Sequence, residues 1–564
     1  MTATEPRRRA KHEQRRGVRR RILVVDRITA AFALLGPGRA ERRPRIWVAA
    51  VLGGAVMTGL ALLRLFVPVP VGMADAGDGF RLLCSVGLAN ERPFTADAMS
   101  AVYPLWSPAD WHAAACPGSD VWSLSPYYGV AALARLLGGG VLDLRILGAL
   151  LAVALGLLTV ALIRYLPGAV PFRLVVAALL GAVLLDGVFA DFLISADLDG
   201  AVLLAVLAGF IALLILWGGW ADRVTTLDVP PRGVAASALG VLLAAAALAT
   251  SPALLAFLPG FVAALVVLPW LRDAEQRRGR ETGRALRGDR GRELARTLAH
   301  RVPSLTAAVA LLAVGAAQAG DALDRVRSDA VYSVVFGTLL PTSPDPEADL
   351  GWFGLPEGAL QASGRSITDP QAGAVLADPA FAAIGIDDLI RFRITHPERI
   401  VAVSDRGLAA IAQPAQQSRG STMLPVGDGE PVQDPRWTPV AGSSPLLLAV
   451  PLLVPGLQFA GMLVALSLAF ARTHPLRSRS LGFATVFAML AGWLHFWAVA
   501  PGDQRVLSEA MLPSTLLFWM GLPLLFACAA VRLAGPGEKS SIRAPEAKNA
   551  LIAAITRPDA RPSP

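Results

Sequence analysis

The chain has 564 residues, of which 54% are hydrophobic and only 17% are charged. Both fractions differ from those of soluble globular proteins in the direction expected for a membrane protein. Its sequence pI is about 10.1, but the basic residues lie mostly between apolar runs, without a nucleic-acid-binding motif. Three scattered cysteines, and the lack of a phosphate-binding loop or dinucleotide-binding turn, exclude the common zinc and nucleotide motifs. We therefore expect a membrane protein with no nucleic acid partner.

Apolar stretches along the chain predict an all-α polytopic membrane protein with about ten transmembrane helices. Most approach the ~20 residues that a helix needs to cross the hydrocarbon core, although the third, fifth and seventh are shorter. A further run of 12 residues, 126–137, contains Arg135 and predicts an amphipathic helix lying at the membrane interface. The ten stretches are residues 46–67, 141–163, 174–190, 200–217, 234–249, 252–270, 302–318, 446–470, 481–500 and 513–531.

The distribution of Lys and Arg predicts the orientation, because positive residues are retained on the cytoplasmic side. Residues 1–45 carry 14 Lys or Arg, and the connector 271–301 carries 10 Arg. With both termini in the cytoplasm, all strongly basic connectors lie inside, including the C-terminal tail 532–564. The connectors that then lie outside are acidic: residues 68–125 have 6 acids against 2 Arg, and residues 319–445 have 16 against 9. We expect a multi-pass protein of a bacterial plasma (inner) membrane, whose basic tail contacts lipid headgroups.

Residues 319–445, between the seventh and eighth helices, are numerous enough for a small extracytoplasmic domain. Short helices are predicted at residues 387–395 and 399–413, separated by His396 and Pro397. The predicted order of segments is therefore a cytoplasmic tail (1–45), seven helices with a first outer loop (46–318, loop 68–125), the small domain (319–445), three helices (446–531) and a second tail (532–564).

Several ionisable residues lie near the predicted outer ends of the spans, where burial of charge is costly. They are Arg64, Asp143, Arg145, Asp186 and His495. Their common depth predicts a polar cavity that opens outward, with His495 as a candidate substrate-binding residue. The alternative is that these side chains snorkel to the interface or pair with one another.

The first outer loop places Asp75 and Asp78 among glycines and alanines directly after the first span, followed by Arg81. A carboxylate there can act as general base toward an acceptor hydroxyl, and Arg81 can bind a phosphate or a carboxylate. Asp and Gly also form ordinary turns, which is the alternative interpretation. A divalent cation held by both carboxylates is possible, but two ligands do not define a metal site.

Two other predicted outer connectors carry charge. Asp191, Asp197 and Asp199 lie between the third and fourth spans and are candidate substrate-binding residues, the alternative being a solvated connector. In the last outer loop, Arg505 is the candidate for binding a lipid phosphate, because its charge would offset that of a leaving phosphate. Cys84 and Cys116 both lie in the first outer loop, so a disulfide between them is expected in an oxidising compartment, with two free thiols as the alternative.

Three segments resemble bacterial glycan-biosynthesis hexose transferases, membrane glycosyltransferases of the GT-C class. They are Gly-Asp-Gly-Phe-Arg at residues 77–81, VYSVVFGTLLPTSPDPEADLGWFGLP at residues 331–356, and IGIDDLIRFRITHPER at residues 384–399. The resemblance implies a polyprenyl-phosphate sugar donor, a glycan or glycolipid acceptor and an extracytoplasmic site. It also implies an acidic base in the first outer loop, which corresponds to Asp75 or Asp78.

The sequence thus favours an inverting hexosyltransferase over two other classes. A transporter or lipid flippase would show paired charges near the bilayer midplane and internal repeats of broken helices, and neither is evident. An inactive scaffold of glycan assembly is the third alternative.

Overall fold

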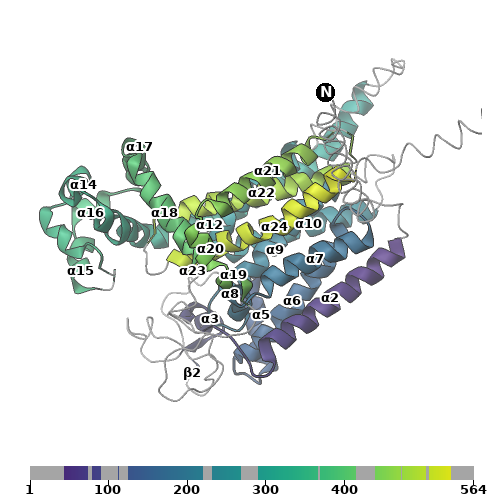
Figure 1. Ribbon diagram of the computed structural model, residues 1–564, viewed down its shortest axis with the longest axis horizontal. Coiled ribbons are helices and arrows are strands. Elements are labelled where there is room, and N and C mark those ends of the chain that lie inside the picture. Colours follow the sequence, from purple (N-terminus) through teal and green to yellow (C-terminus); the bar gives the residue numbers. More distant parts are fainter. Residues whose placement is uncertain are drawn as a thin grey trace, which may run out of the picture.

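The computed structural model describes residues 43–73, 79–89, 112–113, 125–219, 231–267, 290–365, 367, 369–413, 438–471, 473–474, 476–502 and 507–534. These residues are almost entirely helical (Figure 1). Strands are limited, in this part of the chain, to the antiparallel pair β1 (Leu88–Ala89) and β2 (His112–Ala113). The prediction of an all-α polytopic membrane protein is confirmed.

Among the described residues, six helices are long and apolar enough to cross a membrane. A seventh span is present if α7 (Val170–Leu184) and the helical segment Gly187–Leu193, which are bent by 65° at their junction, count as one. The six helices are α2 (Arg43–Phe66), α6 (Leu144–Tyr165), α9 (Asp199–Gly219), α12 (Arg290–Val334), α22 (Leu476–Val499) and α24 (Leu512–Leu533).

The remaining predicted spans coincide with shorter apolar helices. They are α10 (Pro231–Thr250), the segment Pro252–Val267 that begins with η4 (Pro252–Phe257), and α20 (Ser444–Ala449) followed by α21 (Leu453–Ala469). Every predicted apolar stretch is therefore mainly helical over its described residues, whereas the number of ten membrane crossings stays a prediction.

The centre of the bundle is α9, whose span is buried throughout. A helix that is apolar on all sides is stable only when other helices surround it, and α6, α10 and α22 pack against α9. At the periphery, α2 packs on α6 through facing glycines. A Cβ atom on Gly54 would lie 2.7 Å from the Gly156 carbonyl oxygen, so only glycine allows these backbones to approach so closely.

Beyond the bundle, α12 continues past the predicted boundary at residue 319 into a small helical unit with its own aromatic core. Three of its helices begin at an Asp-Pro pair, because the Asp side chain caps the helix and Pro suits the first turn. The unit comprises the π-helical turn η5 (Val335–Leu339), α13 (Leu340–Thr342), α14 (Pro346–Trp352), η6 (Glu357–Ala362), α15 (Pro370–Leu376), α16 (Pro379–Ala383), α17 (Ile386–Thr395) and α18 (Glu398–Ala412).

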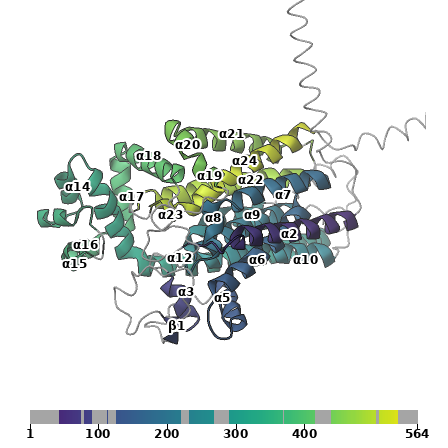
Figure 2. The same ribbon diagram turned by 60° about the horizontal axis from the view of Figure 1, so that its bottom comes forward.

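The two short helices predicted around His396 and Pro397 are confirmed as α17 and α18. The second of them joins the small unit to the bundle, as Figures 1 and 2 show. A Cβ atom on Gly407 of α18 would lie 2.7 Å from the ring of Phe496 and 3.1 Å from Ala500, both at the end of α22. Close packing at Gly407 therefore fixes α18 against the bundle.

The end of the bundle that bears this unit is called here the domain end (Figure 1). The predicted helix at residues 126–137 is confirmed as α5. The other short helices are α3 (Phe80–Ser85), α8 (Gly187–Ala190), η2 (Asp191–Leu193), α19 (Pro439–Gly442) and α23 (Leu507–Ala510).

The orientation predicted from charge can be tested with introduced cysteines. In intact cells we expect Arg365→Cys to react with a membrane-impermeant thiol reagent, and Ala285→Cys to react only after permeabilisation. The parent protein gives the background, because Cys84 is disulfide-bonded and Cys528 is buried. Labelling of Ala285→Cys but not of Arg365→Cys in intact cells would reverse the orientation.

Candidate functional site

A cavity of about 720 Å³ lies among helix ends at the domain end of the bundle. Its walls come from the turn before α9 and the first turn of α9, η4 with the residue before it, the last turns of α22, and α23 with the start of α24. Small-molecule sites commonly have volumes of roughly 300 to 1,000 Å³. The cavity is therefore large enough for a sugar with an attached phosphate.

Three carboxylates line this cavity: Asp197, Asp199 and Glu509. One carboxylate oxygen from each residue lies within 4.8 Å of one oxygen from each of the other two. Backbone contacts fix Asp197, because its N–H donates to the Ser195 hydroxyl at 3.1 Å and its carbonyl accepts from the Tyr127 hydroxyl at 3.2 Å. Burial, and then the nearby Asp197 carboxylate, raise the pKa of Tyr127, so this phenol stays protonated and donates.

His495 lines the same cavity and is only 5% exposed. Its Nδ1 lies 2.7 Å from the Ser514 hydroxyl, and that hydroxyl donates to the Gly492 carbonyl at 3.1 Å. A hydroxyl has one hydrogen, so Ser514 accepts from His495, and Nδ1 carries the proton. Nε2 is then the acceptor nitrogen that His495 can offer to a ligand.

This arrangement has two chemical capabilities. A carboxylate can take a proton from an acceptor hydroxyl, and three neighbouring carboxylates can supply part of the oxygen shell of a divalent cation. Magnesium is usually held by one or two carboxylates together with substrate phosphates, so the described residues fit a cation shared with a phosphorylated ligand. Each of the three carboxylates also takes part in other interactions within the protein.

The first outer loop begins beside the cavity-lining turn. The N–H of Met73 donates to the Ile194 carbonyl at 2.9 Å, and a Cβ atom on Gly72 would lie 2.1 Å from that carbonyl oxygen. Gly72 is therefore required for this approach. The predicted bases Asp75 and Asp78 follow within five residues of Met73, although they lie outside the described residues.

Other predicted site residues also fall partly or wholly outside the described residues. Arg505 and Cys116 lie outside the described residues, and Arg81 is described only as backbone in α3. Cys84 is disulfide-bonded, whereas Cys528 is a free, buried thiol. Cys116 is the third cysteine of the sequence, and its pairing with Cys84 stays a prediction.

Asp191 is not among the residues that line the cavity. It forms an ion pair with Arg64 of α2 at 2.9 Å, and both side chains are buried. Next to this pair, Asp186 accepts from the N–H of Val188 at 2.9 Å and from that of Val440 at 2.8 Å. These contacts hold the break after α7 against α2 and against the start of α19.

The five ionisable residues that were expected to line one polar cavity therefore lie in three different places. His495 lines the cavity, Arg64 and Asp186 belong to the adjoining buried network, and Asp143 pairs with Arg145 at 2.7 Å where α6 begins. Pairing with one another, the alternative interpretation of these residues, holds for Asp143 and Arg145, whereas Arg64 pairs with Asp191.

Sequence reasoning did not select two polar residues that line the cavity, Glu509 and Ser251. Glu509 is the last acidic residue before the final span, a position comparable to that of Asp199 before the fourth. Ser251 caps η4 by accepting from the Ala253 N–H at 3.3 Å, and the Ser-Pro pair between two apolar runs was the signal for a chain break there.

We expect Asp191 to stabilise the fold. Asp191→Asn removes the carboxylate from a buried ion pair, a change that costs about 3 to 5 kcal/mol in typical cases, so thermal unfolding should begin at a clearly lower temperature. Arg64→Gln combined with Asp191→Asn should recover part of the loss. Asp143→Asn is the control, because it weakens an exposed pair and keeps a good N-cap. Equal unfolding temperatures for Asp191→Asn and Asp143→Asn would contradict this role.

The disulfide prediction concerns a 33-residue loop between positions 84 and 116. A peptide map under non-reducing conditions should contain one cross-linked peptide with Cys84 and Cys116, which separates on reduction. Cys528 should react with a thiol reagent only after denaturation, because it is buried. Recovery of Cys84 and Cys116 as free thiols from quenched membranes would exclude the pair.

Comparison with known protein families matches residues 39–418 to the YfdI N-terminal transmembrane domain. No curated protein and no solved structure matches the chain. The matched range includes α2 to α18, and therefore the first outer loop, the turn with Asp197 and Asp199, and the small helical unit. Because it covers well over half of the chain, this protein belongs to the family of the YfdI N-terminal transmembrane domain.

Proposed function

We propose that this protein is a membrane glycosyltransferase that moves a hexose from a polyprenyl-phosphate donor to a cell-envelope glycan or glycolipid acceptor. The reaction would take place on the extracytoplasmic face of a bacterial plasma membrane. The observation that carries the proposal is the cavity at the domain end, lined by Asp197, Asp199, Glu509 and His495.

The position of the cavity suits a lipid-linked donor. Such a donor keeps its apolar chain in the membrane and presents its phosphate and sugar at the interface, which is where the ends of spanning helices lie. The cavity is lined by Leu494, Ala498 and Val499 in the last turns of α22, and by the carboxylates on the short segments beside it. One wall is therefore apolar while the other offers proton acceptors.

The proposed reaction inverts the anomeric centre. The acceptor hydroxyl oxygen bonds to the anomeric carbon as the bond to the donor phosphate breaks, and the bonding electrons leave with the phosphate. Asp78 or Asp75 is the preferred base that takes the hydroxyl proton, and Arg505 offsets the negative charge of the leaving phosphate. Asp197, Asp199 and Glu509 are the alternative bases, because they line the cavity.

A transporter or flippase is the second candidate function. One observation favours it: the helix pair broken by 65° after α7, since broken helices are common in transporters. However, Asp186 at this break accepts a buried hydrogen bond from the N–H of Val440, and this bond opposes movement of the two helices at the break. An inactive scaffold is the third candidate, and it predicts neither transfer nor transport.

A transfer assay separates these functions. The purified full chain is supplied with a panel of radiolabelled polyprenyl-phosphate hexoses and a membrane glycan extract, with one arm containing EDTA. Label passing to the acceptor, or released as free sugar, supports the transferase. Label that only crosses the bilayer of a proteoliposome supports the flippase, and neither result supports the scaffold. The EDTA arm decides whether a divalent cation takes part.

We expect Asp78→Asn or Asp75→Asn to abolish transfer without changing the protein level in membranes. Asparagine keeps the size of the side chain and removes the base, and loss of a general base costs on the order of 10² to 10⁴ in rate. Arg505→Lys should reduce the transfer rate less than Arg505→Ala does, because Lys keeps the positive charge but cannot form the bidentate hydrogen bonds of Arg.

Asp405→Asn is the matched control, because Asp405 is an exposed carboxylate on α18 outside the cavity. If Asp75→Asn, Asp78→Asn and the double variant all transfer sugar at the rate of the parent, the first loop does not hold the base. Asp197→Asn, Asp199→Asn and Glu509→Gln then locate it. Parental rates in these variants as well would remove the cavity from the mechanism.

A further inference from the structure

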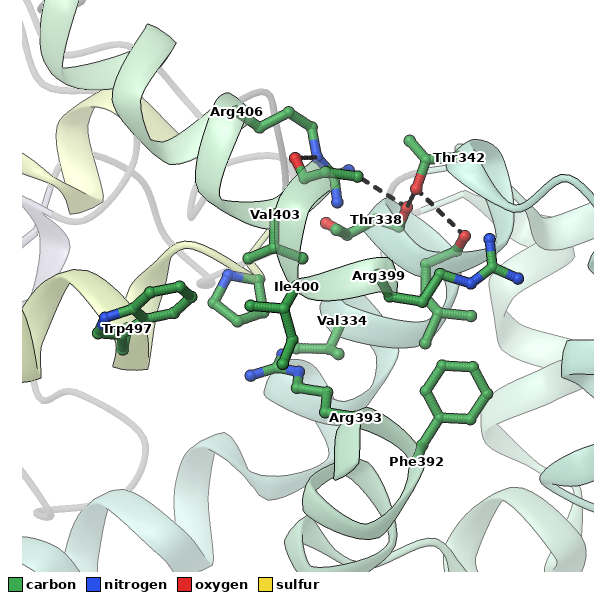
Figure 3. A pocket seen from close by; sticks show the side chains of 13 residues that line it. Val334, Thr338, Thr342, Phe392, Arg393, Arg399, Ile400, Val403, Arg406 and Trp497 are labelled. Atoms are coloured by element: carbon green, nitrogen blue, oxygen red, sulfur yellow. Dashed lines mark hydrogen bonds between the residues drawn. The ribbon is translucent and has the colours of Figure 1, made fainter. Parts of the chain in front are cut away.

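A second, smaller pocket lies where the small helical unit meets the bundle (Figure 3). Its volume is about 140 Å³, and η5, the end of α17, α18 and the end of α22 line it. In Figure 3, Trp497 lies on one side of Ile400, and Phe392 and Arg399 lie on the other. Trp497 and Pro501 face this pocket, whereas Leu494, His495 and Ala498 of α22 line the larger cavity. The two sites are therefore separate.

Two of the arginines that line this pocket, Arg393 and Arg406, have no carboxylate partner among the described residues. Within the described part of the chain, Arg406 donates to the backbone carbonyls of Ala402 and Thr338, at 3.2 and 3.3 Å, and to no side chain. Both side chains are half-buried, and this burial lowers the pKa of each guanidinium. Half-buried positive charge without a counter-charge is unfavourable, so the pocket is suited to an anion.

Arg399 also lines this pocket, but unlike Arg393 and Arg406 it has a carboxylate partner. It donates to Asp349 at 2.9 Å and to the Ser343 hydroxyl at 3.2 Å, so its charge is neutralised inside the small unit. The unbalanced charge of this pocket thus comes from Arg393 and Arg406. Thr338 and Thr342 add hydroxyl groups to the lining.

The π-helical turn η5 contributes to this arrangement. A π turn leaves carbonyl groups and side chains in positions that a regular α-helix does not offer, and such turns are frequent at functional sites. Here the Thr338 hydroxyl donates to the Gly502 carbonyl at 2.5 Å, while the Thr338 carbonyl accepts from Arg406. The turn thereby joins α12, α18 and the end of α22 around the pocket.

The rest of the lining is apolar, with Val334, Leu339, Ile400, Val403 and Trp497 as its main members. Trp497 is 42% exposed near the end of a spanning helix, where aromatic side chains commonly lie at the lipid headgroup level. The pocket volume of about 140 Å³ is below the roughly 300 to 1,000 Å³ of common small-molecule sites, so the pocket suits a phosphate and a few carbon atoms rather than an oligosaccharide.

We propose that this pocket binds the phosphate of an anionic phospholipid from the surrounding membrane, between Arg393 and Arg406, with the first carbon atoms of the lipid against Ile400 and Trp497. The lipid joins the small helical unit to the bundle. This inference does not depend on the proposed glycosyl transfer, because the pocket is separate from the carboxylate cavity.

The first test is native mass spectrometry of the full chain in detergent with added phosphatidylglycerol or phosphatidylcholine. We expect tighter binding of phosphatidylglycerol, and about fivefold weaker binding in Arg393→Gln and in Arg406→Gln, which corresponds to about 1 kcal/mol for each basic residue. Arg391→Gln is the matched control, because Arg391 is an exposed arginine on α17 outside the pocket. Arg393→Lys should retain most of the preference.

A second test uses the parent protein and does not depend on the folding of the arginine variants. Phosphatidylglycerol brominated on its acyl chains near the headgroup should quench tryptophan fluorescence more than brominated phosphatidylcholine does. Trp497→Phe should remove this difference, which assigns it to one of the 12 tryptophans. Equal binding and quenching by the two lipids would overturn the proposal. Full displacement of phosphatidylglycerol by millimolar inorganic phosphate would overturn it in favour of a free-phosphate site.

Discussion

The buried carboxylate of Asp186 joins segments that are far apart in the sequence. It caps α8 by accepting from Val188, and it accepts from Val440, where the chain returns from the small helical unit. The ion pair between Arg64 and Asp191 adjoins it and adds α2 to the same network. A carboxylate without these partners would be too costly to bury, so its hydrogen bonds fix the break after α7. That break directs residues 194–199 toward the candidate site.

The candidate site is a consequence of this arrangement. Spanning helices satisfy their own backbone groups and leave little room for polar chemistry in the apolar region. Polar side chains therefore collect on the short segments between helix ends, and at the domain end these segments carry Asp197, Asp199 and Glu509. The contact between Met73 and Ile194 brings the start of the first outer loop to the same place.

The end of α22 connects the two pockets. One face carries His495 in the larger cavity, and another carries Trp497 in the arginine-lined pocket. Gly407 of α18 packs on Phe496 between them, so the small helical unit rests on the helix that supplies the cavity histidine. A ligand that fixes the small unit would thus act on a wall of the cavity through direct packing.

The sequence by itself determined the membrane class, the approximate positions of the helices in the ten predicted apolar stretches, α5, and the pair α17 and α18, because hydrophobic length, Pro and Asp act locally along the chain. It also selected Asp197, Asp199 and His495, since charge at the ends of apolar runs is conspicuous. Only the tertiary structure decided that these three line one cavity with Glu509, and that Asp191 instead pairs with Arg64. It likewise decided that Arg393 and Arg406 face a pocket whose described lining residues include no carboxylate. Those outcomes depend on which helix ends meet in space, and pairings between residues more than a hundred positions apart leave no local pattern in a single sequence.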